Sequence, residues 1–336
     1  MLAEALQAPA AVALALTQDT DRYKELGAQL REKPPAGIVT LARGSSDHAA
    51  HHFAYLAMAR LGRLVTSLPL SLLTLHPPRL QAADLLGIAF SQSGQSPDLV
   101  GALQTLRAGG ARSLAWVNDS GSPLAQAAEW LLPLHAGPET SVAATKSYIA
   151  QMLAGARLVA AWQDDPALQA ALQALPEALA RAAASDWTPA LPALADVDRL
   201  FVVSRGTGLA VALEAALKFK ETCGIQAEAF SGAELRHGPM ALVGQGYAVL
   251  VLAPRGPAQA GLLTLAAELK ARGAAVLLAA PAGTPAADLP LVPAGHEDLD
   301  AIAAVQSFYP MVEALARQRG HDPDRPAFLA KVTLTR

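Results

Sequence analysis

A short polar loop follows a buried apolar stretch in the first half of the chain. Residues 85–90 are typical of a buried parallel strand, and residues 91–96 then read Ser-Gln-Ser-Gly-Gln-Ser. Pro97 suits the first position of a helix, whose free N–H groups would face the loop. Hydroxyl, amide and helix N–H donors together can bind an anion such as a phosphate without Lys or Arg. An ordinary polar turn between a strand and a helix explains the same residues equally well.

A second set of candidates lies on a helix in the other half of the chain. Glu214, Lys218 and Glu221 recur at helical spacing, so Lys218 shares a face with each glutamate. The residues between them are mostly apolar, so we expect partial burial, and a desolvated Glu beside a Lys is typical of a general base. His237 lies in a turn bounded by Gly238 and suits proton transfer near neutral pH. A solvated row of ion pairs is the alternative for the helix.

Other chemistry-bearing residues give weaker indications. The histidines at 48, 51 and 52 could suit a metal, but histidines on a helix surface are far commoner, and we expect no metal and no cofactor. Cys223 is expected to be an inert core residue rather than a nucleophile. Gly206 and Gly208 lack the third glycine of a dinucleotide fingerprint, and no Walker sequence is present.

Alternating strands and helices must position these residues. The pattern predicts an N-terminal helix or helix pair over 2–31, then strands near 38–42, 64–67, 85–90, 113–117 and 130–134, with a long helix over 142–162. The second half repeats this order, with strands near 200–204, 248–253, 275–279 and 289–292 and helices ending near Glu221, 271 and 318. Such alternation predicts parallel sheets covered on both faces, with the polar loops at the carboxyl ends of the strands.

The two halves also share a local sequence. Arg43-Gly44-Ser45-Ser46 follows the first strand, and Arg205-Gly206-Thr207-Gly208 follows the corresponding strand of the second half. This repetition indicates two copies of one α/β fold, each a doubly wound parallel sheet in three layers. The expected boundaries are an N-terminal helical segment 1–34, a first domain 35–165, a linker helix 166–195, a second domain 196–320 and a tail 321–336.

Composition excludes several classes of protein. The chain has 336 residues, 52% of them hydrophobic and 16% charged, which suits a folded α/β protein of two domains. The formal net charge is −3 and no basic block occurs, so neither nucleic acid nor a membrane surface is expected as a partner. A single cysteine rules out a disulfide framework. No signal peptide or membrane span is recognised, and a cytoplasmic location is expected.

Five segments together resemble the sugar isomerase (SIS) family, in particular the isomerase half of glucosamine-6-phosphate synthase and the SIS-type glucosamine-6-phosphate deaminases. The resemblance runs in order from about residue 35 to the end of the chain. A lysine-bearing tail, Leu329-Ala330-Lys331-Val332-Thr333, is similar to the C-terminus of the family. The five segments are 43–46, 91–96, 141–146, 214–221 and 234–239.

The resemblance implies flavodoxin-like SIS domains and a hexose or hexosamine 6-phosphate substrate. It implies that Glu221 is the base moving a proton between C1 and C2, that Lys218 assists, and that Lys331 forms a Schiff base with the keto sugar. It implies a homodimer in which His237, the ring-opening group, is donated across the interface. The implied substrate-binding residues are Ser45, Ser46, Ser91, Gln92, Ser93, Ser96, Val142 and Ala330.

One departure from the synthase bears on the reaction. Only about thirty residues precede the first expected strand and none is a cysteine, so no glutaminase domain is recognised. The resemblance therefore favours deamination of glucosamine-6-phosphate to fructose-6-phosphate and ammonia. Alternatives are an aminotransferase-like isomerase domain, a fructosamine-6-phosphate deglycase, a galactosamine-6-phosphate deaminase and, less favoured, a non-catalytic sugar phosphate sensor.

Overall fold

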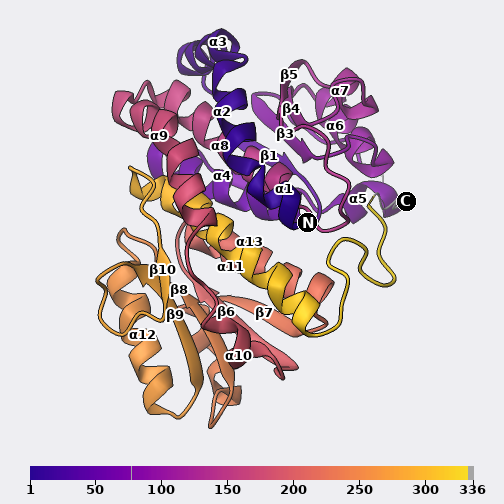
Figure 1. The fold of residues 1–336 in the computed structure, drawn as a ribbon. Helices are drawn as coiled ribbons and strands as arrows, with labels where there is room; N and C mark the ends of the chain where they lie inside the picture. Colours follow the sequence, from indigo (N-terminus) through magenta and orange to yellow (C-terminus); the bar gives the residue numbers. More distant parts are fainter. Residues whose placement is uncertain (77, 332–336) are drawn as a thin grey trace. The chain divides into compact units, whose positions relative to one another are not determined.

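Strands and helices alternate along the chain in the computed structural model, which describes residues 1–76 and 78–331. They form two parallel five-stranded sheets with flanking helices (Figure 1). One compact unit contains residues 10–139, 146–170 and 330–331, and the other contains residues 1–9, 140–145 and 171–329. The predicted α/β fold of two doubly wound parallel sheets is confirmed.

The first sheet has the strand order β2-β1-β3-β4-β5, with every neighbouring pair parallel. Strand β3 pairs with β1 on one side and β4 on the other, which brings the end of β3 to the middle of the sheet edge. Its strands are β1 (Gly37–Leu41), β2 (Val65–Ser67), β3 (Leu85–Ser91), β4 (Arg112–Val117) and β5 (Trp130–Pro133).

Alternate side chains of the first sheet enter two separate cores. On one face Phe90 and Trp116 pack edge to face at 4.7 Å between ring centroids, and Phe53 of helix α4 completes the aromatic cluster. On the other face Ala89 and Val117 pack with helices α5, α6 and α7. This alternation produces the three layers. The helices are α1 (Leu2–Leu6), α2 (Ala8–Thr17), α3 (Thr20–Glu32), α4 (Ser45–Leu61), α5 (Leu70–Leu75), α6 (Pro97–Ala108), α7 (Pro123–Ala127) and α8 (Lys146–Gln163).

Three details of the first half differ from the sequence-based expectation. The N-terminal segment forms three helices rather than one or two, and the short helix α5 was not expected. The long helix begins at Lys146 rather than Val142, because the Glu139 carboxylate accepts the Ser147 N–H in the first turn of α8.

The second sheet repeats the arrangement of the first. Its order is β10-β9-β8-β6-β7, so in both sheets the first strand along the chain lies between the second and the third. The strands are β6 (Arg199–Ser204), β7 (Gln226–Ser231), β8 (Ala248–Leu252), β9 (Ala275–Pro281) and β10 (Leu289–Leu291). The remaining helices are α9 (Pro166–Ala183), α10 (Ala190–Leu194), α11 (Gly208–Cys223), α12 (Gln259–Ala271) and α13 (Asp300–Gln318), with 3-10 turns η1 (Glu234–Arg236), η2 (Pro239–Leu242) and η3 (Glu297–Leu299).

Helices α11 and α13 pack against one another through the edge-to-face rings of Phe219 and Phe308, whose centroids are 5.2 Å apart. Helix α12 packs in a separate core with Val203 and Val251. Strand β7 was not predicted, because this edge strand alternates Ala and Glu and is mostly exposed or half-buried.

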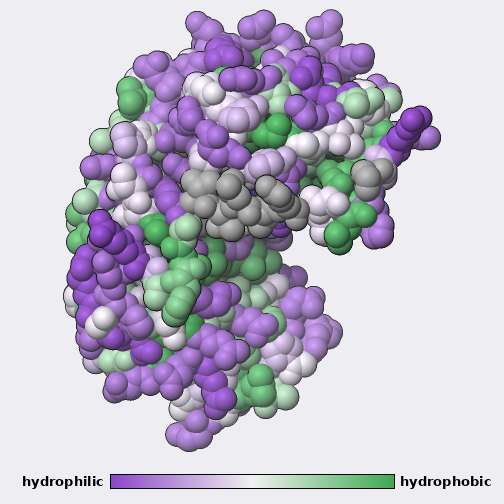
Figure 2. All heavy atoms as spheres, turned by 90° about the vertical axis from the view of Figure 1, so that its right-hand side faces the viewer, coloured by the Kyte–Doolittle hydropathy of each residue, from purple (hydrophilic) through white to green (hydrophobic). Residues whose placement is uncertain are grey.

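None of the described helices is long and apolar enough to cross a membrane. The face of the molecule drawn in Figure 2 is mainly hydrophilic, with smaller hydrophobic patches among the hydrophilic residues.

Candidate active site

The polar loop 91–96 joins the end of β3 to the N-terminus of α6, as predicted. The Ser91 hydroxyl is buried and accepts the Gly94 N–H at 2.9 Å, so Ser91 shapes the loop. Ser93 is half-buried, and its hydroxyl accepts the Gln95 N–H at 3.3 Å. The side chains of Gln92 and Ser96 form no hydrogen bond with any described residue, so their polar groups are available to a ligand.

Gly94 is required by the geometry of this loop. Its φ is +64°, and a Cβ built on it would lie 2.1 Å from Ser122 Oγ and 2.6 Å from Ser122 Cβ. Ser122 is held in place because it caps α7, accepting the Ala125 N–H at 3.3 Å. The loop backbone therefore packs against the neighbouring helix start with no room for a side chain.

Ser45 and Ser46 lie in the first turn of α4, in the same unit as the loop. The Ser46 hydroxyl accepts a hydrogen bond from Gln151 Nε2 of α8 at 3.0 Å. Gly44, with φ +53°, turns the chain sharply from β1 into this helix. Both serines are half-buried, and α4 and α6 both start at the carboxyl end of the first sheet. Two helix N-termini at one sheet edge favour an anion there.

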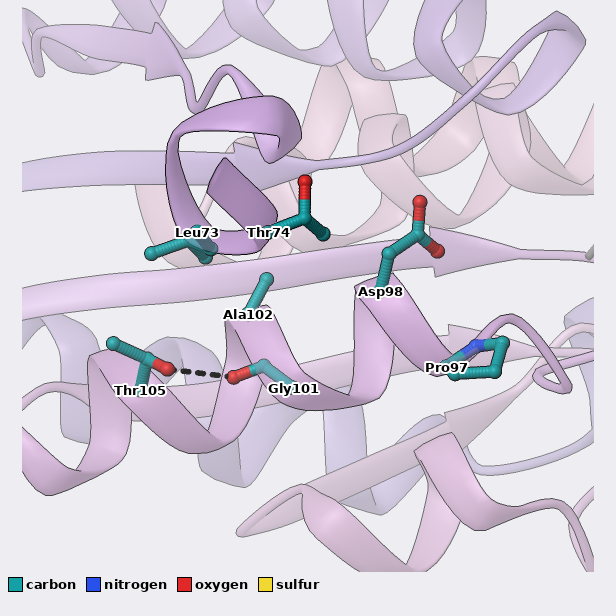
Figure 3. A pocket seen from close by; sticks show the side chains of 7 residues that line it. All are labelled: Leu73, Thr74, Pro97, Asp98, Gly101, Ala102 and Thr105. Atoms are coloured by element: carbon teal, nitrogen blue, oxygen red, sulfur yellow. Dashed lines mark hydrogen bonds between the residues drawn. The ribbon is translucent and has the colours of Figure 1, made fainter. Parts of the chain in front are cut away.

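A groove between α5 and α6 adjoins the loop (Figure 3). Its ionisable group is Asp98, whose buried carboxylate is bound by Arg43 Nε at 2.7 Å and Nη2 at 2.6 Å. The carboxylate that lines the groove is therefore paired with a guanidinium. The groove is lined by Leu73, Thr74, Pro97, Asp98, Gly101, Ala102 and Thr105.

Helix α11 carries a buried row of three charged residues in the second unit. Lys218 Nζ lies 3.2 Å from Glu214 Oε1 and 2.6 Å from Glu221 Oε2. The Lys218 and Glu214 side chains are 1% and 0% exposed, whereas Glu221 is 21% exposed. Burial lowers the pKa of Lys218, but the two glutamates outweigh it and the pKa is raised, so the lysine stays protonated. The alternative of a solvated ion-pair face is wrong.

Two other residues of this unit differ in their surroundings. His237 follows η1, is exposed, and forms no side-chain hydrogen bond with any described residue. Cys223 is fully buried at the end of α11, and burial raises the pKa of its thiol to about 11. A neutral buried thiol is a poor nucleophile.

The tail lysine Lys331 is bound by a carboxylate that sequence reasoning missed. Glu139 Oε2 lies 3.0 Å from Lys331 Nζ and accepts the Ser147 hydroxyl at 2.5 Å. The Glu139 side chain is 0% exposed and Lys331 is 22% exposed. In the sequence, the only local signal for this contact is the position of Glu139, between strand β5 and the segment 141–146.

Val142 and Ala330, the two expected backbone contacts to sugar, belong to different compact units. The Val142 N–H donates to the Asp324 carbonyl at 3.2 Å. Ala330 is exposed. The residues Val332 and Thr333 of the similar tail lie outside the described residues.

The histidines of α4 are not all on its surface. His52 is fully buried, contrary to the expectation of surface histidines, and burial lowers the pKa of His51. No group of three or more His, Cys, Asp or Glu side chains suited to a metal occurs within 1–76 and 78–331.

Residues 33–161 and 193–315 match the SIS domain family. The chain belongs to this family. The two matched segments contain the two sheets, so each SIS match corresponds to one copy of the repeated fold.

Curated SIS proteins with longer chains are related to it. A glutamine–fructose-6-phosphate aminotransferase of Symbiobacterium thermophilum is 37% identical over 263 residues, covering 73% of this chain and 43% of that protein. A Thermus thermophilus protein of the same name is 32% identical over 327 residues, covering 91% and 53%. The chain thus spans about half the length of these relatives.

Solved SIS structures share the fold. A provisionally assigned phosphosugar isomerase of Silicibacter pomeroyi is 42% identical, with a TM-score of 0.91 over 96% of this chain and 99% of the other. The C-terminal domain of glucosamine-fructose-6-phosphate aminotransferase from Francisella tularensis has a TM-score of 0.87 at 23% identity, covering 97% of each chain. A glucosamine-6-phosphate deaminase of Thermotoga maritima has a TM-score of 0.73 at 22% identity over 97% and 100%. At these two lower identities the likeness concerns the fold alone.

Proposed function

We propose that the chain is a phosphosugar isomerase of the SIS family that deaminates glucosamine-6-phosphate to fructose-6-phosphate and ammonia. The observation that carries the proposal is the 2.6 Å pair of buried Lys218 with partly exposed Glu221. A carboxylate that is reachable from solvent yet bound to an ammonium can take up and return one proton. This is the step that interconverts an aldose and a ketose.

Each proposed residue has a defined step. Loop 91–96, Ser45 and Ser46 hold the sugar phosphate through uncharged donors. These residues lie at the N-termini of α6 and α4, and a helix N-terminus favours an anion. His237 transfers the proton that opens the ring, and Glu221 moves the C2 proton to C1, giving a ketimine at C2. The amine of Lys331 adds to C2 and expels ammonia, and water then hydrolyses the enzyme imine to fructose-6-phosphate and free lysine. The carbonyls of Val142 and Ala330 orient the sugar.

We further propose a homodimer in which His237 serves the site of the partner subunit. Its exposure and its lack of a hydrogen bond to any described residue support a role outside its own chain. Mixing inactive His237→Ala protein with inactive Glu221→Gln protein should then restore activity, because mixed dimers contain one intact site. If His237 acts within its own chain, mixed dimers stay inactive.

The reaction is tested by incubating the purified chain with glucosamine-6-phosphate and following ammonia and fructose-6-phosphate by separate coupled assays. Equal amounts of both products are expected. Borohydride added during turnover should attach one sugar phosphate to Lys331, detectable by peptide mass, and Lys331→Met should abolish the attachment. Absence of turnover with glucosamine-, galactosamine- and fructosamine-phosphates would refute the proposal.

A second function is favoured by the names of the curated relatives, which are glutamine–fructose-6-phosphate aminotransferases. In that case the SIS domains would interconvert hexose 6-phosphates and use ammonia derived from glutamine. Conversion of fructose-6-phosphate to glucose-6-phosphate without ammonia release from glucosamine-6-phosphate would favour this function.

A further inference from the structure

Gln151 of α8 is a buried amide to which the proposed mechanism assigns no step. The residue is 1% exposed, and its Nε2 donates to the Ser46 hydroxyl at 3.0 Å. Its Oε1 is buried and has no hydrogen-bond partner among the described residues. An unpaired buried acceptor destabilises a fold, so stability alone does not account for a glutamine at this position.

The packing of α4 against α8 brings Gln151 to Ser46. The two helices lie side by side within one compact unit (Figure 1). Gly155 lies one turn after Gln151 on the same face of α8, and a Cβ built on it would lie 3.1 Å from Phe53 Cβ of α4. This close approach places the Gln151 amide at the first turn of α4, where Ser46 lies. Because Gln151 is almost completely buried, it can act on a ligand only through Ser46.

The direction of this hydrogen bond decides what Ser46 can offer to a ligand. A serine hydroxyl carries one hydrogen and two lone pairs, and it rotates to suit its partners. Because the Gln151 N–H occupies one lone pair, the hydrogen of the Ser46 hydroxyl is left for another acceptor. Without Gln151 the hydroxyl would be free to rotate, or to donate to a carbonyl of the preceding turn as helical serines do.

We propose that Gln151 is a positioning residue that directs the hydrogen of the Ser46 hydroxyl toward the phosphate of the substrate. The inference rests on the proposed function insofar as that function places the phosphate at Ser46 and loop 91–96, but it does not depend on the deamination step. A phosphate monoester offers strong acceptor oxygens, so a serine whose hydrogen is fixed toward them binds better than one whose hydrogen points elsewhere.

The test measures binding of glucitol-6-phosphate by calorimetry, because this probe has the phosphate but no carbonyl or amine that could react. Gln151→Met cannot donate, and the Ser46 hydroxyl then regains three staggered positions and a competing helix acceptor, so the Kd should rise about three- to tenfold. Inorganic phosphate, used as a competitor, should weaken by the same factor, because it contains the group that Ser46 binds. The melting temperature should not fall, because the substitution also removes an unpaired buried acceptor. A merely structural role would lower the melting temperature and leave the Kd unchanged.

A double-mutant cycle with Ser46→Ala shows whether Gln151 acts through the serine. Ser46→Ala removes a hydrogen bond to a charged group and should raise the Kd roughly 10- to 100-fold. In that background Gln151→Met should have no further effect on the Kd, because no hydroxyl is left to direct. Should Gln151→Met not fold, Gln151→Ala needs no additional space, lacks the donor as well, and should give the same pattern of Kd values.

Gln306→Met is the matched control. Gln306 is also buried, its Nε2 donates to the Ala5 carbonyl at 3.0 Å, and its Oε1 has no partner in the described part of the chain. The substitution therefore removes the same groups from a position that does not touch Ser46, and its Kd should equal that of the wild type.

The outcomes separate this inference from the proposed function. A wild type that binds the probe but releases no ammonia from glucosamine-6-phosphate refutes deamination alone, and the Kd values of the variants still decide the role of Gln151. If the wild type deaminates and Gln151→Met has the same Kd as the wild type, only the role of Gln151 is refuted. Tighter binding by Gln151→Met would mean that the amide oxygen faces Ser46, and a further loss in the Ser46→Ala background would mean that Gln151 does not act through the serine. Either result would overturn the inference, and a wild type that does not bind the probe would overturn both proposals.

Discussion

Replacing Gly94 by alanine tests whether loop 91–96 needs its tight backbone. A left-handed φ of +64° costs alanine about 1–2 kcal/mol relative to glycine. The new Cβ would also meet Ser122 Oγ at 2.1 Å and Ser122 Cβ at 2.6 Å, and overpacking of this kind costs about 1–3 kcal/mol. The two effects together predict a loss of about 2–5 kcal/mol in the free energy of unfolding.

The assay is thermal denaturation followed by circular dichroism. In a unit of this size each kcal/mol lowers the melting temperature by about 2–4 °C, so a fall of roughly 4–20 °C is expected. Under the proposed function, the KM for glucosamine-6-phosphate should rise as well, because the displaced loop no longer aims its hydroxyl and amide donors at one point.

Two further variants separate the overpacking against Ser122 from the backbone cost of a left-handed alanine. Ser122→Gly removes both atoms that the new Cβ meets, and glycine replaces a helix cap at a cost of only a few tenths of a kcal/mol. The variant Gly94→Ala/Ser122→Gly should therefore regain the roughly 1–3 kcal/mol of overpacking while keeping the backbone cost. Gly101→Ala is the matched control, because it lies within α6 with no atom near its Cβ and should stabilise by about 0.4–1 kcal/mol.

The reasoning would be refuted if Gly94→Ala melted at the temperature of the wild type. A double variant no more stable than Gly94→Ala would show that Ser122 is not the obstacle.

Three other predictions concern buried polar groups. Burial acts to raise the pKa of Glu4, but the N–H groups of Thr140 and Ser141 outweigh it and the pKa is lowered, so Glu4→Gln should cost about 1.5–3 kcal/mol at pH 7. The stabilisation is present above the usual value of 4.5 and is lost as pH falls through the lowered pKa. Melting temperatures of variant and wild type should therefore converge at pH values below that pKa, and a pH-independent difference would contradict this. Burial raises the pKa of the Cys223 thiol to about 11, so iodoacetamide at pH 7 should label it only after unfolding, and rapid labelling of the folded protein, read by mass, would count against its burial. Glu139→Gln removes the charge facing Lys331 and should speed tryptic cleavage after that lysine, whereas an unchanged rate would mean that the pair does not hold the tail.

Most of the fold was predictable because its signals are local. The apolar run of β3 followed by Pro97 defines a buried strand and a helix start, and these same residues form them in the structure. The start of α8 was not predictable, because Glu139 caps it from a loop seven residues before Lys146. Strand β7 was missed because Ala and Glu carry no strand preference, and pairing with β6 alone makes the segment extended.

The candidate site likewise contains one feature that the sequence predicts and one that only the structure shows. The row of Glu214, Lys218 and Glu221 follows from helical spacing, and only the depth of its burial needed the structure. The contact of Glu139 with Lys331 spans 192 residues of sequence, and no periodicity can reveal such a pair.

The shared strand order of the two sheets has a consequence for how such a protein can diverge. After β8, the counterpart of β3, the chain reads Ala-Pro-Arg-Gly-Pro over residues 253–257 instead of a serine-rich loop. There Arg255 is fastened to Asp300 by two contacts of 2.7 and 2.8 Å. The two copies thus share a strand order, but a serine-rich loop follows β3 and an arginine bound to an aspartate follows β8. Corresponding loops of such a protein can therefore differ in chemistry while the strand order of its sheets stays the same.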